Sequence, residues 1–363
     1  MEFIDLKTQY REIEEEVQLR INKVLEHGRY IMGPEILTLE QHLSDFVGIK
    51  HSVGVASGTD ALLLALMALE IKPGDEVITT PFTFIATAEM IALIGAKPVF
   101  VDIDPETYNI DPNQLEAAIT DKTKAIITVD LYGLCADYDA VSAVAKQHNV
   151  AVIEDAAQSF GATYKGRKAC SLGDITCTSF FPSKPLGCYG DGGAVFTDND
   201  VLAERIKQLR VHGQSKRYYH TSIGFNGRLD TLQAAILLAK LAIFPQEVQA
   251  RHRIGERYID LLKDHVVTPV QLPDYQSVYG QFTVRVKHRD QVQATLKEQG
   301  IPTAIHYPVC IHQQPAFEYL GYKPGDFPHA EKAAAEVMSL PMHPYLADED
   351  IKKIALAVIA TQD

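Results

Sequence analysis

Residues 51–69, HSVGVASGTDALLLALMAL, join a short apolar strand directly to an apolar helix. We predict a strand at Ser52–Ala56 and a helix at Thr59–Leu69, with a small-residue turn between them. A strand that passes straight into a helix is the repeating unit of α/β folds. This stretch therefore favours an α/β fold, provided that the same alternation continues along the chain.

The alternation does continue. Helical patterns lie between the early strands, as expected for a mostly parallel sheet that is covered on both faces. The last two strands have no helix between them, so part of the seven-stranded sheet should be antiparallel. The further strands are predicted at Glu76–Thr79, Pro98–Asp102, Ala125–Val129, Ala151–Glu154, Thr176–Phe180 and Ala194–Thr197, and the helices at 86–94, 112–119 and 138–148.

The two ends of the chain predict additional elements. Helices are expected at 11–27 and 35–46, and a long helix from 229 to 244 should break at Pro245 and resume through Leu262. The remainder predicts a strand at 279–286, a helix at 290–299, a strand at 303–306 and a closing helix at 348–360. We predict a large domain at 1–244, with an N-terminal helical segment at 1–46, and a small α+β domain at 245–363.

Bulk properties exclude several classes of protein. The chain has 363 residues and a net charge of -13, which disfavours nucleic acid or an anionic membrane as a partner. We expect no apolar run long enough to span a bilayer, and residues 1–9 do not resemble a signal peptide. The five cysteines form no C-x-x-C pair, which indicates reduced thiols in a cytoplasmic protein without a metal site.

Ser57-Gly58-Thr59-Asp60-Ala61 opens the first of the α/β helices. Free backbone N–H groups and the helix dipole attract a phosphate at such an end, Gly58 permits close approach, and Thr59 adds a hydroxyl. Capping of the helix by Ser57 or Thr59 explains the segment equally well.

A carboxylate follows the strand VIED at 152–155. In α/β folds, ligands bind at the carboxyl ends of strands. Asp155 should point toward such a ligand and Glu154 toward the opposite face. A carboxylate placed there could pair with the ring nitrogen of a pyridoxal cofactor, and Gln158 could bind the ring hydroxyl. Helix capping by a loop carboxylate is the alternative.

Lys184 lies in TSFFPSKPLG (178–187), shortly before the turn GDGG (190–193). A lysine in a dry pocket has a lowered pKa and becomes nucleophilic, and Ser179 could reach a phosphate. A lone lysine is more often a solvated surface charge, so Lys184 gains its interest from these neighbours.

Five ordered motifs resemble the sugar aminotransferases of the DegT/DnrJ/EryC1/StrS family. They are SGTDA, PFTFIATA, EDAAQSFGA, SFFPSKPLGCYGDGGA and GFNGRLDTLQAAIL, and the resemblance covers nearly the whole chain. It implies a fold-type I aminotransferase that uses pyridoxal 5'-phosphate and forms a homodimer with shared active sites.

By this resemblance, Lys184 would form the Schiff base with the cofactor and Asp155 would pair with the pyridinium nitrogen. The other cofactor contacts that it implies are Gln158 with the ring hydroxyl, Gly58, Thr59 and Ser179 with the phosphate, Phe84 with the ring face, and Asn226 with the phosphate from the neighbouring subunit.

Within the family, the resemblance is to enzymes of bacterial O-antigen and lipopolysaccharide synthesis that act on UDP-2-acetamido-2-deoxy-3-oxo-glucuronate with L-glutamate as donor. Two alternatives stay open: a 4-aminotransferase acting on a 4-keto-6-deoxy nucleotide sugar, and a non-catalytic regulator that binds pyridoxal phosphate. The chain leaves no room for a DNA-binding module, which disfavours the regulator.

The resemblance also implies a pocket for the sugar, formed by Gly28, Tyr30, Ser183, Arg228, His306 and Tyr307. For His306-Tyr307, packing within a strand of the small domain is the alternative explanation.

Overall fold

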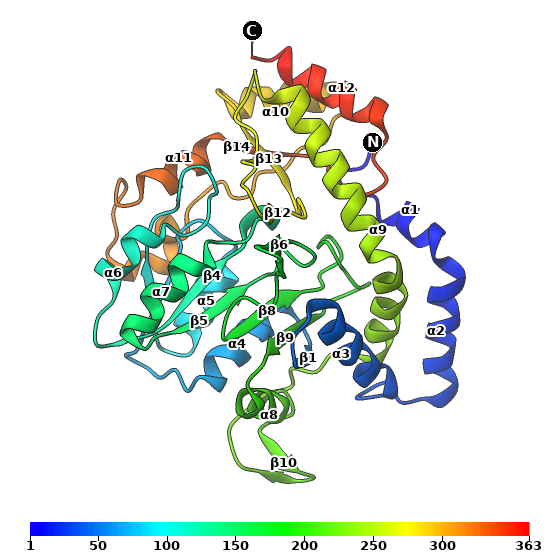
Figure 1. The fold of residues 1–363 in the computed structure, drawn as a ribbon, viewed down its shortest axis with the longest axis vertical. Coiled ribbons are helices and arrows are strands. Elements are labelled where there is room, and N and C mark those ends of the chain that lie inside the picture. Colours follow the sequence, from blue (N-terminus) through cyan, green and yellow to red (C-terminus); the bar gives the residue numbers. More distant parts are fainter. Residues whose placement is uncertain (363) are drawn as a thin grey trace.

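The computed structural model describes residues 1–362, and a seven-stranded sheet forms its centre (Figure 1). The strand order is β1-β9-β8-β5-β4-β2-β3, and β9 runs antiparallel to both of its neighbours while the other pairings are parallel. This confirms the predicted α/β class, the seven strands and the antiparallel part. The strands are β1 (His51–Val55), β2 (Glu76–Thr79), β3 (Lys97–Phe100), β4 (Thr123–Val129), β5 (Ala151–Asp155), β8 (Ile175–Ser179) and β9 (Gly193–Thr197).

Helices cover both faces of this sheet. Alternate residues of one strand enter different cores: Ile127 of β4 packs with α4 and α5, whereas Ile126 packs with α7. Strand β2 is buried throughout, as expected for a parallel strand covered on both sides. The helices involved are α4 (Gly58–Ala68), α5 (Ala86–Leu93), the short η1–α6 segment (Pro112–Gln114 and Leu115–Ala118), α7 (Tyr138–His148) and α8 (Asp200–Leu209), of which the sequence did not predict α8.

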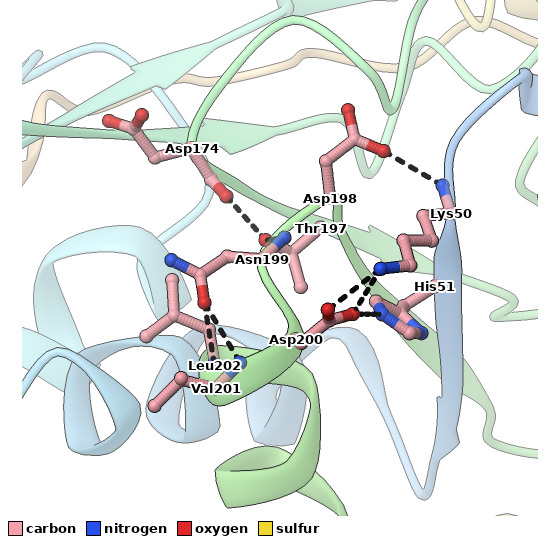
Figure 2. Close-up of polar contacts among 9 residues, drawn as sticks. All are labelled: Lys50, His51, Asp174, Thr197, Asp198, Asn199, Asp200, Val201 and Leu202. Carbon is pink, nitrogen blue, oxygen red and sulfur yellow. Dashed lines mark hydrogen bonds and ion pairs between the residues drawn. The ribbon is translucent and has the colours of Figure 1, made fainter.

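Figure 2 shows how charged groups attach α8 to the sheet on the side where β1 begins. Asp200, the first residue of α8, accepts a hydrogen bond from Nζ of Lys50 at 2.7 Å and contacts Nε2 of His51 at 2.6 Å. Asn199 caps the helix by accepting from the backbone N–H of Val201 at 2.9 Å. This exposed cluster fixes the position of a helix and lies outside the cavity described below.

The long helix α9 (Thr231–Leu262) leads from the sheet to the C-terminal elements (Figure 1). The predicted break at Pro245 is wrong, since α9 continues through it, and burial of the residues around it supports the helix despite the missing N–H. Contrary to expectation, α9 is long and apolar enough to span a membrane, but 61% of its most apolar window is buried inside the protein, as in a core helix. The predicted helix 11–27 is also divided, into α1 (Leu6–Glu12) and α2 (Glu14–His27), followed by α3 (Pro34–Val47).

The C-terminal part is built around β13 (Phe282–Arg285) and β14 (Val337–Leu340), which pair antiparallel. The strand predicted at 303–306 is wrong. In this segment only Ala304 pairs with a neighbour, in an isolated bridge to Ser339, and a single bridge does not make a strand. The domain boundary near Pro245 stays a prediction. The remaining elements are β6 (Thr163–Tyr164), β7 (Arg167–Lys168), β10 (Gln214–Lys216), β11 (Tyr219–His220), β12 (Tyr275–Gln276), α10 (Arg289–Glu298), the 3-10 helices η2 (Leu131–Gly133), η3 (Ile311–Gln313) and η4 (Pro315–Leu320), α11 (Pro328–Glu336) and α12 (Asp348–Ile359).

Candidate active site

A cavity of about 440 Å³ lies at the carboxyl ends of β5 and β8, where α4 begins. A groove of about 790 Å³ beside α8 is larger, but it contains none of the residues that the sequence motifs singled out. The smaller cavity contains most of them, brought together from positions 58 to 307. Its wall includes the predicted residues Gly58, Thr59, Phe84, Asp155, Gln158, Ser179, Ser183, Lys184, His306 and Tyr307.

Asp155 and Lys184 provide opposite charges in this cavity. Burial raises the pKa of Asp155 above its ordinary value, and hydrogen bonds from Thr87 and Ala157 and the charge of Lys184 offset part of that shift. The Thr87 hydroxyl donates to Oδ2 at 2.8 Å, and the Ala157 N–H donates to Oδ1 at 3.2 Å. Burial lowers the pKa of Lys184, and Asp155 opposes that shift. The cavity thus holds a fixed carboxylate and an amine that loses its proton more readily than a surface lysine does.

As predicted, Glu154 points away from Asp155. Its carboxylate accepts the backbone N–H groups of Cys170 at 2.6 Å and Leu172 at 2.8 Å, on the other face of β5. Adjacent residues of a strand face opposite sides, so Glu154 stabilises the 170–172 loop and only Asp155 reaches the cavity.

The start of α4 combines capping with an anion site. Ser57 caps the helix by accepting the Asp60 N–H at 3.0 Å, which bears out the capping interpretation for that residue. A Cβ atom on Gly58 would lie 2.6 Å from Cβ of Ser179, so only glycine lets the two segments approach this closely. The first N–H groups of α4 thereby lie beside the Ser179 hydroxyl, a combination that suits a phosphate.

The opposite wall contains an oriented amide and aromatic rings. The backbone N–H of Tyr132 donates to Oε1 of Gln158 at 2.9 Å, which leaves Nε2 as the donor, 3.4 Å from the hydroxyl of Tyr307. Phe84 is 53% exposed, and its ring centroid lies 6.2 Å from that of Tyr307. An exposed ring in a cavity wall offers a face to a flat ligand.

His306 is held neutral in this wall. Burial and the charge of Lys184 lower its pKa to about 4, and Nδ1 lies 2.8 Å from the hydroxyl of Ser339. His306 therefore faces the cavity as a hydrogen-bonding group without a charge.

Comparison with known proteins agrees with this geometry. The model of the DegT/DnrJ/EryC1/StrS aminotransferase family matches residues 11–359. The chain belongs to this family.

Several known proteins resemble the chain over nearly its full length. UDP-2-acetamido-2-deoxy-3-oxo-D-glucuronate aminotransferase of Pseudomonas aeruginosa is 55% identical, with 99% of each chain covered. A pleiotropic regulatory protein of Geobacillus stearothermophilus is 48% identical, with 97% of each covered. UDP-N-acetyl-3-dehydro-alpha-D-glucosamine 3-aminotransferase of Acidithiobacillus ferrooxidans is 44% identical, covering 99% of this chain and 97% of the relative.

Solved structures show the same fold. An aminotransferase of the family from Brucella abortus superimposes with a TM-score of 0.97 at 43% identity, covering 100% of this chain and 99% of the other. NtdA from Bacillus subtilis, solved with the bound cofactor PMP, superimposes with a TM-score of 0.89 at 32% identity, covering 99% and 83%.

Four predicted residues of this aminotransferase do not line the cavity of their own chain: Gly28, Tyr30, Asn226 and Arg228. Gly28 and Tyr30 lie in the α2–α3 connection, and Asn226 and Arg228 lie in the segment before α9, where they form bridges with Val211 and Val55. The carbonyl of Tyr30 accepts the N–H of Thr231 at 3.0 Å, next to a bridge between Ile31 and Asp230. Tyr30 is 47% exposed and Asn226 is also exposed. This geometry is expected if Asn226 contributes to the cavity of a neighbouring subunit. Tyr30 and Arg228 could contribute to a neighbouring cavity in the same way.

The cavity wall contains further residues that sequence reasoning missed, among them Thr83, Thr87 and Gln281. The two threonines lie within the motif PFTFIATA, so the motif contained a signal, and their hydroxyl oxygens lie 3.3 Å apart. Gln281 immediately precedes β13 and belongs to no motif.

Proposed function

We propose that this aminotransferase uses pyridoxal 5'-phosphate to aminate C3 of UDP-2-acetamido-2-deoxy-3-oxo-D-glucuronate, with L-glutamate as the amino donor. The observation that carries the cofactor is the placement of Lys184 beside buried Asp155 in a cavity that also contains the start of α4. The relative from Pseudomonas aeruginosa supports the sugar, since its name states this substrate and 55% of its residues are identical.

The residues present fit this cofactor. Lys184 would hold the aldehyde carbon, Asp155 the ring nitrogen and Phe84 the ring face. Gly58 lets the start of α4 approach Ser179 closely, and the phosphate would sit where the first N–H groups of α4 and the Ser179 hydroxyl come together. When bound, pyridoxal phosphate supplies an electron sink for bonds at the donor's α-carbon.

The chain's own groups then divide the work. Thr87 and the Ala157 N–H keep Asp155 oriented and favour its ionised form. Lys184, whose pKa is lowered by burial, can release and recover a proton at Nζ, as proton transfer near neutral pH requires. Gln158, fixed through its carbonyl oxygen, directs its N–H donors into the cavity.

We also propose that the surface around exposed Asn226 and half-buried Arg228 completes the cavity of a second subunit in a homodimer. Within the described chain, Lys184 and His306 are the basic side chains of the cavity wall, and the lowered pKa of His306 keeps it neutral. A substrate that carries a carboxylate and a diphosphate needs more positive charge than this, and the guanidinium of Arg228 would provide it from the partner subunit.

Mixed dimers test this sharing. Lys184→Ala and Arg228→Ala subunits, each inactive alone, should regain activity when unfolded and refolded together, because one cavity of each mixed dimer has both residues. Failure to regain activity, with mixed dimers verified by mass spectrometry, would place Arg228 in the site of its own chain.

The substrate is tested by incubating the protein with the 3-oxo uronate, glutamate and pyridoxal phosphate, and measuring 2-oxoglutarate and the amino sugar. UDP-N-acetyl-3-dehydro-glucosamine, which has a hydroxymethyl group in place of the C6 carboxylate, is the matched comparison. Equal turnover of both sugars, or faster turnover of a 4-keto-6-deoxy sugar, would contradict the uronate. Absence of the glutamate half-reaction would instead favour a regulator, as the name of the Geobacillus relative suggests.

We propose that the protein serves O-antigen and lipopolysaccharide synthesis in the cytoplasm.

A further inference from the structure

One residue behind the cavity wall contacts the wall at three points. Tyr132 lies in η2, the turn that follows β4, and is 7% exposed. Its φ of 59° falls in the left-handed region, which is unfavourable for a tyrosine. A backbone of this kind persists only where the surroundings fix it. The contacts of Tyr132 therefore need an explanation.

Each polar group of Tyr132 binds a different residue of the wall. The N–H donates to Oε1 of Gln158 at 2.9 Å, and the carbonyl accepts a long hydrogen bond of 3.5 Å from the N–H of Gln281. The phenol hydroxyl donates to the carbonyl oxygen of His306. Gln158, Gln281 and His306 all line the cavity, whereas Tyr132 does not. One side chain and its peptide groups thus join three segments that are far apart in the sequence.

The turn that carries Tyr132 is itself firmly held. The Leu131 N–H donates to Oδ1 of Asn109 at 2.9 Å, and the Val278 N–H donates to the carbonyl of Gly133 at 3.0 Å. The ring of Tyr132 packs edge-on against Tyr108, with centroids 5.5 Å apart. Tyr132 is therefore a rigid support from which the less regular 303–307 segment is positioned.

We propose that Tyr132 is a positioning residue that sets the place of His306-Tyr307, and with it the sugar side of the cavity, relative to the cofactor side. This rests on the proposed function for the assignment of the two sides. The division follows from the chemistry: the peptide N–H of Tyr132 serves Gln158, and the phenol serves the carbonyl of His306. A change that removes only the hydroxyl should disturb the sugar side and leave the cofactor side intact.

Tyr132→Phe makes that change. The matched control is Tyr108→Phe, because Tyr108 is also buried and its ring packs against that of Tyr132. In Tyr132→Phe, KM for the sugar nucleotide should rise roughly three- to tenfold, the loss expected for one buried hydrogen bond. The absorbance of the bound cofactor and the rate of the glutamate half-reaction should stay unchanged. Backbone amide exchange should become faster in residues 303–309 and remain unchanged in 155–160. Tyr108→Phe should change none of these quantities.

Amide exchange needs no substrate, so it separates this proposal from the proposed function. If the wild type does not aminate the sugar, the proposed function fails, and exchange in 303–309 alone decides whether Tyr132 positions that segment. Unchanged exchange in 303–309 overturns the positioning role. Faster exchange with an unchanged sugar KM overturns its link to the sugar. Equal damage to the glutamate half-reaction overturns the division into two sides.

Discussion

Lys240 offers a sharp test of how burial acts on charge in this protein. It lies within α9, is 1% exposed, and donates from Nζ to the carbonyl of Gly187 at 2.6 Å. Its other close contact is the ring of Tyr189, whose centroid lies 4.5 Å from Nζ. Gly187 belongs to the turn that follows Lys184, so Lys240 fixes the turn next to the proposed cofactor lysine. We choose Lys240→Met, which keeps the length of the side chain and removes the charge and the hydrogen bond.

The magnitude follows from the pKa. Burial lowers the pKa of Lys240 from its ordinary value of 10.5 to about 8. That difference corresponds to roughly 3 kcal/mol of unfavourable free energy for keeping the lysine charged at neutral pH. Leaving the Gly187 carbonyl without a partner costs about 1–3 kcal/mol. At pH 7, Lys240→Met should therefore range from equal stability to about 2 kcal/mol more stable than the wild type.

The pH dependence gives the more decisive result. The folded pKa lies below the unfolded value, so between about pH 8 and pH 10.5 the unfolded chain binds a proton that the folded protein does not. The free energy of unfolding of the wild type should therefore rise with pH in this window, relative to the methionine variant. Near pH 10 the order should reverse, and the wild type should be the more stable protein by about 1–3 kcal/mol.

Urea unfolding of the cofactor-free proteins at pH 7 and pH 10 measures this difference, since bound ligand would add its own stabilisation. Lys263→Met is the control, because Lys263 follows the same helix and its side chain is 54% exposed. The control should show no comparable dependence on pH. A stability difference for Lys240→Met that is the same at both pH values would refute the reasoning.

Three further predictions follow from single contacts. Thr87→Val should weaken binding of pyridoxal phosphate roughly tenfold, because it removes the hydroxyl that donates to Asp155 at 2.8 Å; equilibrium dialysis measures this, and unchanged affinity would count against it. The pKa of His306 is lowered to about 4, so between pH 6.5 and pH 4 the unfolded chain binds a proton that the folded protein does not. The contribution of His306 to the free energy of unfolding should therefore be complete above pH 6.5 and be lost as the pH falls from 6.5 toward 4. Urea unfolding at several pH values measures this, and a His306→Gln variant with the same pH profile as the wild type would contradict it. Asp102→Ala should reduce stability by about 1–2 kcal/mol in thermal unfolding, since that carboxylate accepts the N–H groups of His329 and Ala330, both at 2.9 Å, at the start of α11; an unchanged melting temperature would exclude this capping role.

Local sequence signals predicted the elements whose formation depends on local pattern. The bounds of β2 and α7 are those expected from the sequence, since each has a clear hydrophobic period and a polar boundary. The break at Pro245 was wrong because tertiary burial along α9 outweighs the local preference of proline. The strand at 303–306 was wrong because its composition suits a strand, but the fold supplies a partner only at Ala304.

In the candidate site, too, the sequence predicted what depends on residue type and could not predict what depends on three-dimensional context. Motif chemistry identified Lys184, Asp155 and Gly58, because a nucleophile, a buried carboxylate and a close-approach glycine each need a particular residue type. The sequence could not state which chain uses Arg228, since one residue can serve its own cavity or that of a neighbour without any change in the motif. That distinction depends on the relative positions of two surfaces.

Thr87 and Tyr132 escaped sequence reasoning for a different reason. Neither is a nucleophile, an acid of the proposed reaction or a glycine at a tight turn. Thr87 acts through the carboxylate of Asp155, and Tyr132 acts through the amide of Gln158 and the carbonyl of His306. The chemistry of a positioning residue is that of an ordinary hydrogen bond, which a threonine or tyrosine can make almost anywhere. Its importance comes from what the partner does, so it can be recognised only when the partner has been assigned a role and the three-dimensional structure shows the contact.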